Sequence, residues 1–389
     1  MPLALEGIKI LDMAWLGPGP FCSFMLGDLG ADIIHIYEAH PERRGGPVLM
    51  LFDPSRPGLR NCRTMGLDLK SDAGKQVFKD MVKTADVVME GFRPGVVKRL
   101  GVDYDVVKEI NPGVVYASLS GYGQDGPYWD KVGHDINYVA LSGLLGMTGP
   151  KGGKPAIPGS VIGDFLGGMS AAVGILSALL SRVNTGRGQY VDMSMTDAVV
   201  ELNSMEINNY LQNRDVVPRK GDTMFTGRYA WYNVYETKDG KYLSIGSLEP
   251  WFFSNLCKLL ECEEFIPYEF DDGEKREEIK AYFTGKFLTK TRDEWIELLS
   301  REDTCVAPVY DIDELENDPH LVARRMIVES DHPDKGRVKH VGSMHKLSQS
   351  PITVRNWATA SNQHTDEILR EIGYDAARIE ELRAADVIG

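Results

Sequence analysis

The first half of the chain alternates short apolar runs with segments in which apolar residues recur every three to four positions. The apolar runs IKILDMA, ADIIHIY, ADVVMEGF and VVYASLS are rich in β-branched residues and are predicted to be strands. Residues 19–30, 71–84 and 102–111 have helical periodicity, with Ser71 as a candidate N-cap. Strands that alternate with helices in this way predict an α/β fold with an open, Rossmann-like parallel sheet.

Residues 163–180 form the longest apolar stretch, GDFLGGMSAAVGILSALL. Asp164, several glycines and two serines interrupt it, so its length and polarity favour a buried core helix over a membrane span. Small residues let neighbouring elements approach closely, which predicts that this helix lies deep in the fold. A strand-like run, YVDMSM, follows it.

The pattern changes after about residue 224. RYAWYNVYE and KYLSIGSL flank the turn residues TKDG, which predicts an antiparallel hairpin, and helices are predicted at 251–261, 277–287 and 291–300. Thr291 and Glu294 fit a capping box for the last of these. The predicted division is a large Rossmann-like domain over 1–200, a linker over 201–224, a smaller α+β domain over 225–330, and an amphipathic return segment over 331–389 that completes the large domain.

Composition narrows the classes of function. With 43% hydrophobic and 26% charged residues in 389, the chain is globular, and its net charge of −14 argues against nucleic-acid partners. The five cysteines are scattered, without a CxxC pair or a metal-ligand spacing, and are expected to be reduced thiols. No leader or targeting pattern is recognisable, so we expect a cytoplasmic protein that binds neither a membrane nor a metal.

The segment GHDINY, residues 133–138, carries the first candidate chemistry. His134 is one of 8 histidines and lies between a turn-rich run and an apolar run. Neighbouring side chains point in different directions, so Asp135 is a poor partner for the imidazole in one ligand site. Asp164, at the start of the small-residue helix, is the stronger candidate. A core histidine and a helix N-cap are the structural alternatives for His134 and Asp164, and the residues alone leave them open.

Six segments together resemble the class III CoA-transferase family, also called CaiB/BaiF. They are GPGPFCSFMLGDLGAD (17–32), LDLKS (67–71), GFRPGVVKRLG (91–101), SGYGQDGPY (120–128), GHDINYVALSG (133–143) and GDFLGGMSAAVGIL (163–176). The resemblance runs over essentially the whole chain and implies an open Rossmann-like large domain, a smaller domain between its two parts, and an interlocked homodimer.

Within the family, GHDINY resembles the α-methylacyl-CoA racemase branch. That resemblance implies that His134 and Asp164 are a pair of acid/base groups, and that Glu249 in SIGSLEPWF hydrogen-bonds the histidine. A favourable acidic charge just before Pro250, at a helix N-terminus, is the alternative for Glu249.

The implied reaction is racemisation or epimerisation of a 2-methylacyl-CoA thioester by 1,1-proton transfer through an enolate. One group removes the α-proton and the other returns a proton to the opposite face, so neither a metal nor a redox cofactor is expected, and CoA is part of the substrate. The runner-up is a CoA-transferase in which Asp164 is the nucleophile. A non-enzymatic CoA- or nucleotide-binding protein and a nicotinamide dehydrogenase are further alternatives, although GPGP replaces the GxGxxG fingerprint of the latter.

The resemblance also implies a set of residues that hold the CoA. They are Arg60, Arg63, Gly66, Leu67, Asp68, Leu69, Arg93, Gly133, Asp135, Ile136, Asn137 and Tyr138. The chain departs from the racemase pattern after the second predicted strand, where IYEAHPERR replaces a VDRP-like run. Arg43 or Arg44 is the candidate substitute there, and a different placement of the CoA phosphates is the alternative.

Overall fold

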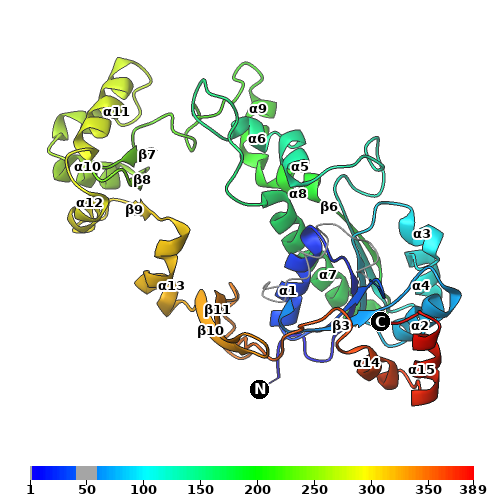
Figure 1. Ribbon diagram of the computed structural model, residues 1–389. Coiled ribbons are helices and arrows are strands. Elements are labelled where there is room, and N and C mark those ends of the chain that lie inside the picture. Colours follow the sequence, from blue (N-terminus) through cyan, green and yellow to red (C-terminus); the bar gives the residue numbers. More distant parts are fainter. Residues whose placement is uncertain (1, 41–58) are drawn as a thin grey trace. The chain divides into compact units, whose positions relative to one another are not determined.

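The structure is a computed structural model that describes residues 2–40 and 59–389 (Figure 1). The chain folds into two compact units. Unit 1 comprises Met1–Gly143, Gly159–Ser204 and Val322–Gly389, and unit 2 comprises Leu144–Pro158 and Met205–Leu321. The C-terminal segment therefore returns to the unit that contains the first strand, and Leu144–Pro158 belongs with unit 2, although it lies within the predicted large domain.

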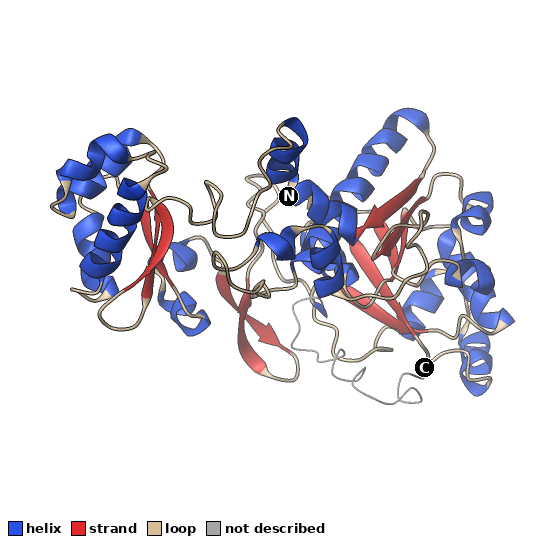
Figure 2. Ribbon diagram, turned by 90° about the horizontal axis from the view of Figure 1, so that it is seen from above, coloured by secondary structure: helices blue, strands red, loops and turns tan. Residues whose placement is uncertain are grey.

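The described part of unit 1 contains a six-stranded parallel sheet, drawn as red arrows on one side of Figure 2. Its strands are β1 (Lys9–Met13), β2 (Asp32–Tyr37), β3 (Cys62–Gly66), β4 (Val87–Glu90), β5 (Val115–Ser120) and β6 (Tyr190–Ser194). The strand order is β3-β2-β1-β4-β5-β6, the doubly wound arrangement in which the direction of winding reverses between β1 and β4. The predicted α/β class with a Rossmann-like sheet is confirmed.

The strands that the apolar pattern predicted are β1, β2, β4 and β5, and YVDMSM contains β6. β3 escaped prediction because its sequence, CRTMG, is short and has two adjacent polar residues, Arg63 and Thr64, in place of an apolar run. It lies at the edge of the sheet and pairs with β2 alone, so packing and register decide it rather than propensity.

Helices cover both faces of this sheet (Figure 1). α1 (Pro18–Asp28) and α7 (Ile162–Thr185) contribute to the core on one face, and α2, α4, α14 and α15 contribute to the core on the other. The remaining bounds in unit 1 are α2 (Asp72–Val82), α3 (Val96–Leu100), α4 (Tyr104–Ile110), α5 (Asp135–Leu141), α8 (Met195–Leu202), α14 (Thr365–Glu371) and α15 (Ala376–Ala384). The Ser71 hydroxyl accepts the Gly74 N–H at 3.0 Å, which confirms the predicted N-cap of α2.

α7 is the long small-residue helix. By length and composition it could cross a membrane, yet 44% of its most apolar window is buried inside this unit and it packs along α1. A Cβ added at Gly168 would lie 2.6 Å from the carbonyl oxygen of Pro18, so only glycine permits this approach of the two helices. One face of α7 therefore belongs to the core, as predicted, while Val173, Leu180 and Val183 on the same helix are exposed in the single chain.

Unit 2 is built on a three-stranded antiparallel sheet of β7 (Tyr232–Glu236), β8 (Tyr242–Gly246) and β9 (Val306–Val309). β7 and β8 are the predicted hairpin, and Thr291 and Glu294 form the predicted capping box. Trp231, Phe283 and Trp295 are fully buried in its core. The other elements of this unit are α6 (Leu144–Met147), α10 (Pro250–Leu259), the 3₁₀ helices η4 (Glu263–Tyr268) and η5 (Ile312–Asn317), α11 (Glu274–Phe287) and α12 (Arg292–Leu299).

Two helices lie at the points where the chain passes between the units, α9 (Ser204–Gln212) and α13 (Pro319–Ala323). α9 occupies much of the predicted linker over 201–224. After α13, β10 (Ile327–His332) and β11 (Gly336–Val341) pair as an antiparallel hairpin of unit 1. The boundary predicted at 330/331 falls inside this hairpin, because the alternation of IVESDH and GRVKHV is too polar to predict a strand pair.

Candidate active site

The main candidate site is a cavity of about 720 Å³ in unit 1. Residues that follow β1, β4 and β5 line it, together with residues at the N-termini of α5 and α7. It therefore lies at the carboxyl ends of the strands where the winding reverses, which is where doubly wound folds bind their ligands. The structure brings six of the predicted residues together in this one cavity: Arg93, Gly133, His134, Asn137, Tyr138 and Asp164.

His134 ends the loop after β5 and begins α5 in an extended backbone conformation. The Asn137 side-chain oxygen accepts the His134 N–H at 3.0 Å, and the Tyr138 hydroxyl donates to the Gly133 carbonyl at 2.6 Å. The Tyr138 ring covers Gly121 and Gly133 so closely that a Cβ at either glycine would overlap it. Tyr138 and Asn137, both predicted to bind CoA, thus hold the histidine loop in place.

Asp164 lies in the first turn of α7 and is not its N-cap, because Val161 occupies that position. A Cβ at Gly17, which has a φ of 65°, would lie 3.5 Å from Oδ1 of Asp164, so the loop after β1 passes next to the carboxyl group. Burial and the neighbouring Asp135 raise the pKa of Asp164 to about 6, and His134 acts in the opposite direction. No described residue hydrogen-bonds this carboxylate. Asp164 is therefore a carboxyl group whose proton can be exchanged near neutral pH.

The Asp135 side chain points away from the cavity that His134 lines. Its Oδ1 accepts the backbone N–H of Asp164 at 3.0 Å, which places its negative charge at the positive end of the α7 dipole. The expectation that His134 and Asp135 face different partners agrees with this geometry. Ile136, the next predicted residue, is 41% exposed and does not line the cavity.

Of the predicted arginines within residues 2–40 and 59–389, only Arg93 lines the cavity. The buried Arg60 forms a bidentate pair with Asp28, with N–O distances of 3.0 and 2.7 Å. Arg63 pairs with Asp32 and Glu371 at 2.6 Å each, and also with the Glu367 carboxylate. Both guanidinium groups thus have carboxylate partners within the chain. Arg43 and Arg44 lie outside the described residues.

The predicted CoA-binding segment, Gly66 to Leu69, does not line the cavity either. It ends β3 and uses its backbone within the protein: Leu67 donates to the Tyr37 carbonyl at 2.9 Å, and Asp68 donates to the Val387 carbonyl at 2.8 Å. Leu67 is buried. The role of this segment in CoA binding stays a prediction.

Glu249 belongs to unit 2 and is the N-cap residue of α10, directly before Pro250, without a side-chain cap hydrogen bond. Burial and, to a smaller extent, the charge of Glu249 raise the pKa of Glu269 to about 7. The described residues contain no cluster of three or more potential metal ligands.

Sequence reasoning missed Glu90, the buried last residue of β4. Its carboxylate accepts the Phe92 N–H at 2.8 Å and so positions the turn that precedes Arg93. Burial raises the pKa of Glu90 to about 7. An acidic residue at the end of an otherwise apolar strand, VVME, was the signal that could have found it.

The fold and the cavity define an α/β protein with an acid, an imidazole and an arginine at the switch point of a doubly wound sheet. A family model described as CoA-transferase family III matches residues 5–365. The chain is 33% identical to the α-methylacyl-CoA racemase of Homo sapiens over 99% of this chain and 98% of that protein. It is 32% identical to the succinyl-CoA:L-malate CoA-transferase β subunit of Chloroflexus aurantiacus, over 99% and 98%.

Among solved structures, a CaiB/BaiF family protein from Brucella suis superposes with a TM-score of 0.81 at 26% identity, covering 96% of this chain and all of that one. The chain therefore belongs to CoA-transferase family III, and the predicted family is confirmed. Its similar relatives include proteins named as racemases and proteins named as CoA-transferases.

Proposed function

We propose that the protein racemises or epimerises 2-methylacyl-CoA thioesters, with His134 and Asp164 as the two acid/base groups. The observation that carries this proposal is that both side chains line one cavity and that the pKa of Asp164 is raised to about 6. A carboxyl group with a pKa raised to about 6 can act as acid or as base near neutral pH, and the His134 imidazole lines the same cavity as its partner.

The proton balance is simple. In one direction the Asp164 carboxylate removes the α-proton from one face of the substrate, and the His134 imidazolium donates its proton to the other face. The products are a protonated Asp164, a neutral His134 and the inverted stereocentre. These protonation states are the ones required for the reverse direction, in which His134 is the base.

The intermediate is an enolate whose negative charge must be stabilised. His134 and Asp164 stand at the N-termini of α5 and α7, where helix dipoles favour negative charge. The Asp164 N–H already donates to Asp135, so the stabilising donors are other groups around the cavity. Chain residues alone supply the acid and the base, and we propose no cofactor beyond the CoA of the substrate.

Arg93 is the proposed contact for a CoA phosphate, because it lines the same cavity. The family resemblance also suggests an interlocked homodimer. Three apolar residues of α7, Val173, Leu180 and Val183, support it, since they are 59%, 69% and 80% exposed in the single chain. Light scattering tests this part of the proposal, and a monomer at micromolar concentration would contradict it.

Solvent exchange tests the reaction itself. Purified protein incubated with one epimer of a 2-methylacyl-CoA in D₂O should produce both epimers, each carrying deuterium at the α-carbon. Mass and chirality analysis of the recovered thioester measures both events. A substrate panel that shows neither exchange nor inversion would refute the proposal.

A CoA-transferase is the second candidate, supported by the family description and by the transferase names of several relatives. In that reaction the Asp164 carboxylate would attack the thioester carbonyl and release the CoA thiolate. Hydroxylamine added during turnover would then trap Asp164 as a hydroxamate. In the proposed racemase Asp164 remains unmodified and CoA is not transferred to a free acid.

A further inference from the structure

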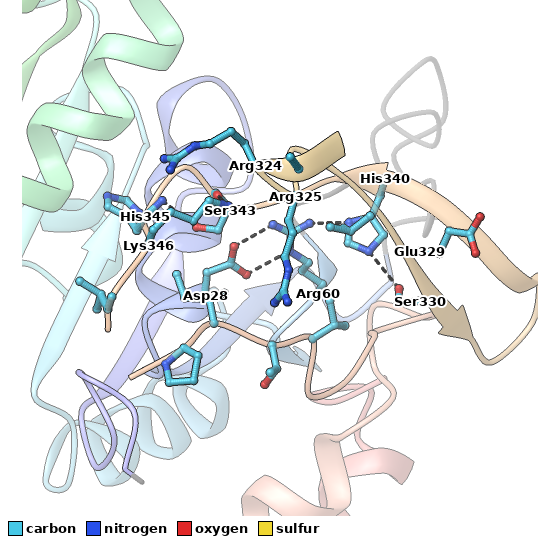
Figure 3. Close-up of a pocket in the computed structure, with 18 of the residues that line it drawn as sticks. Asp28, Arg60, Arg324, Arg325, Glu329, Ser330, His340, Ser343, His345 and Lys346 are labelled. Carbon is cyan, nitrogen blue, oxygen red and sulfur yellow. Dashed lines mark hydrogen bonds and ion pairs between the residues drawn. The ribbon is translucent and has the colours of Figure 1, made fainter. Parts of the chain in front are cut away.

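A second hollow in unit 1, with a volume of about 680 Å³, lies between Arg60, the β10–β11 hairpin and the loop that follows it (Figure 3). It shares no lining residue with the cavity of His134 and Asp164. We define it as the basic hollow, after three cationic side chains, Arg324, Arg325 and Lys346, that line it. The protein as a whole has a net charge of −14, so this local excess of positive charge is unusual for the chain.

Arg60 and Asp28 in the wall of the hollow form a neutral, buried pair. Figure 3 shows the Arg60 guanidinium between the Asp28 carboxylate on one side and the His340 ring on the other. Arg60 is 2% exposed and Asp28 is 1% exposed. Arg60 also donates to the Val341 carbonyl at 2.6 Å. This hydrogen bond connects the β10–β11 hairpin to the rest of unit 1. This pair builds the wall and adds no net charge to the hollow.

His340 and Ser330 add an uncharged donor. Burial and the adjacent Arg60 lower the pKa of His340, which keeps the ring neutral. Arg60 can only donate, so Nδ1 of His340, at 2.7 Å from the guanidinium, is the acceptor and Nε2 carries the proton. Nε2 lies 3.0 Å from the Ser330 hydroxyl and donates to it. The hydroxyl proton of Ser330 is therefore available to a ligand.

Arg324, Arg325 and Lys346 have no counter-charge among the residues that the structure describes. None of the described carboxylates forms an ion pair with these three side chains. Glu329, which also lines the hollow, is paired with Arg337 at 2.8 Å. Burial and the charges of Arg324 and Arg325 lower the pKa of Lys346, which means that the three cations repel one another. A bound anion would remove this repulsion.

The backbone holds part of this arrangement in a defined conformation. Arg325 has a φ of 53°, a value that few side chains adopt, and its carbonyl packs onto Gly342 so tightly that a Cβ there would overlap it. The Gly342 N–H donates to the Met326 carbonyl at 2.8 Å. Lys346 donates to the Ser343 carbonyl at 2.6 Å. These contacts fix the backbone at Arg325, and the last hydrogen bond holds the exposed Lys346 ammonium group next to the Ser343 carbonyl.

We propose that the basic hollow binds the phosphate group of a small organic anion. Two guanidinium groups, an ammonium group and a serine hydroxyl match the donors that a phosphate dianion requires. Val328, Leu347 and Ile352 line the same hollow and leave an apolar surface for the organic part of the ligand. The site is distinct from the proposed catalytic cavity and does not depend on the racemase proposal.

Titration calorimetry of the full-length protein with inorganic pyrophosphate tests the site. The double variant Arg325→Asn and Lys346→Gln should weaken binding by at least about tenfold, since each lost charge-assisted contact contributes that much. Asparagine tolerates a positive φ, so the backbone at 325 is preserved. Arg99→Gln, which removes an exposed cation of α3 in the same unit, is the matched control and should bind like the wild type. Thermal unfolding verifies that all variants are folded.

Competition with CoA separates this site from the catalytic cavity. Saturating CoA should leave pyrophosphate binding unchanged, and Arg93→Gln should weaken CoA binding alone. The proposal is overturned if the wild type does not bind pyrophosphate, or if Arg99→Gln weakens binding as much as the double variant. It is also overturned if CoA displaces pyrophosphate, because the anion would then occupy the CoA site.

Discussion

The cavity that His134 and Asp164 line and the basic hollow each contain a partly or fully buried aspartate, and the two carboxyl groups differ in their partners. Asp28, in the wall of the hollow, is buried and held by a bidentate arginine. Asp164, in the cavity, receives no hydrogen bond from a described side chain, and its pKa is raised to about 6. A paired buried charge stabilises a particular arrangement, whereas an unpaired one is costly and remains available to a ligand.

The largest expected effect concerns His134, which lines the same cavity as Asp164. His134→Ala should lower the racemisation rate by about 10²–10⁴-fold, because a positioned general acid/base group typically contributes that much. Binding of the CoA thioester should stay within a few-fold of the wild type. His320→Ala, at an exposed histidine of α13, is the control. A variant at His134 with the wild-type rate would show that this histidine is structural.

The next effect concerns the paired aspartate. Arg60→Met leaves the Asp28 carboxylate buried without its partner and should lower the free energy of unfolding by about 3–5 kcal/mol. Urea titration measures this loss. The double variant with Asp28→Asn removes the uncompensated charge and should recover part of the stability. Equal losses in the single and double variants would contradict the role of charge.

Replacing Asp164 should stabilise the protein, in contrast to the loss of stability expected for Arg60→Met. The folded pKa of Asp164, about 6, lies above the ordinary value of 3.8 for an aspartate, so the folded state favours the protonated carboxyl. That contribution is present below about pH 4 and is lost as the pH rises through 6. Asp164→Asn should therefore stabilise the protein by about 1–2 kcal/mol at pH 8, after allowance for partial exposure, and by much less at pH 4. Urea titrations at the two pH values measure the difference, and a destabilised variant at pH 8 would contradict it.

The smallest expected effect is a shift of the pH–rate profile when the charge of Asp135 is removed. Asp135→Asn keeps an oxygen that can accept the Asp164 N–H but removes the charge that raises the Asp164 pKa. The acid limb of the pH–rate profile should therefore move to lower pH, by about 0.5–1 unit. Asp130→Asn, on the loop before His134, changes the same charge without that hydrogen bond and is the control. A shift to higher pH would show that Asp135 acts through another group.

Local pattern predicted much of the fold. β1, β2, β4 and β5 are apolar runs with nearly every residue buried. Such runs are typical of the strands of a parallel sheet. The edge strand β3 and the β10–β11 hairpin were missed, because their sequences are short or polar and their pairing depends on partners far away in the chain.

The candidate site, like the fold, was predictable only in part. GHDINY and GDF were recognised through the resemblance to CoA-transferase family III, and that resemblance restricted the expected chemistry to proton transfer or acyl transfer. The sequence did not show which arginines remain available to bind a ligand. Asp28 and Asp32, which pair with Arg60 and Arg63, lie about thirty residues earlier in the chain, and only the pairing of neighbouring strands brings them together.

The sequence by itself determined the alternation of strands and helices, the caps at Ser71 and Thr291, and the presence of an imidazole and a carboxyl group in turn-rich segments. Only the tertiary structure decided that His134 and Asp164 share a cavity, that Asp135 turns to the N-terminus of α7, and that Arg60 is internally neutralised. The physical reason is that strand and helix formation depend on neighbours in the chain, whereas burial and charge pairing depend on distances set by strand order.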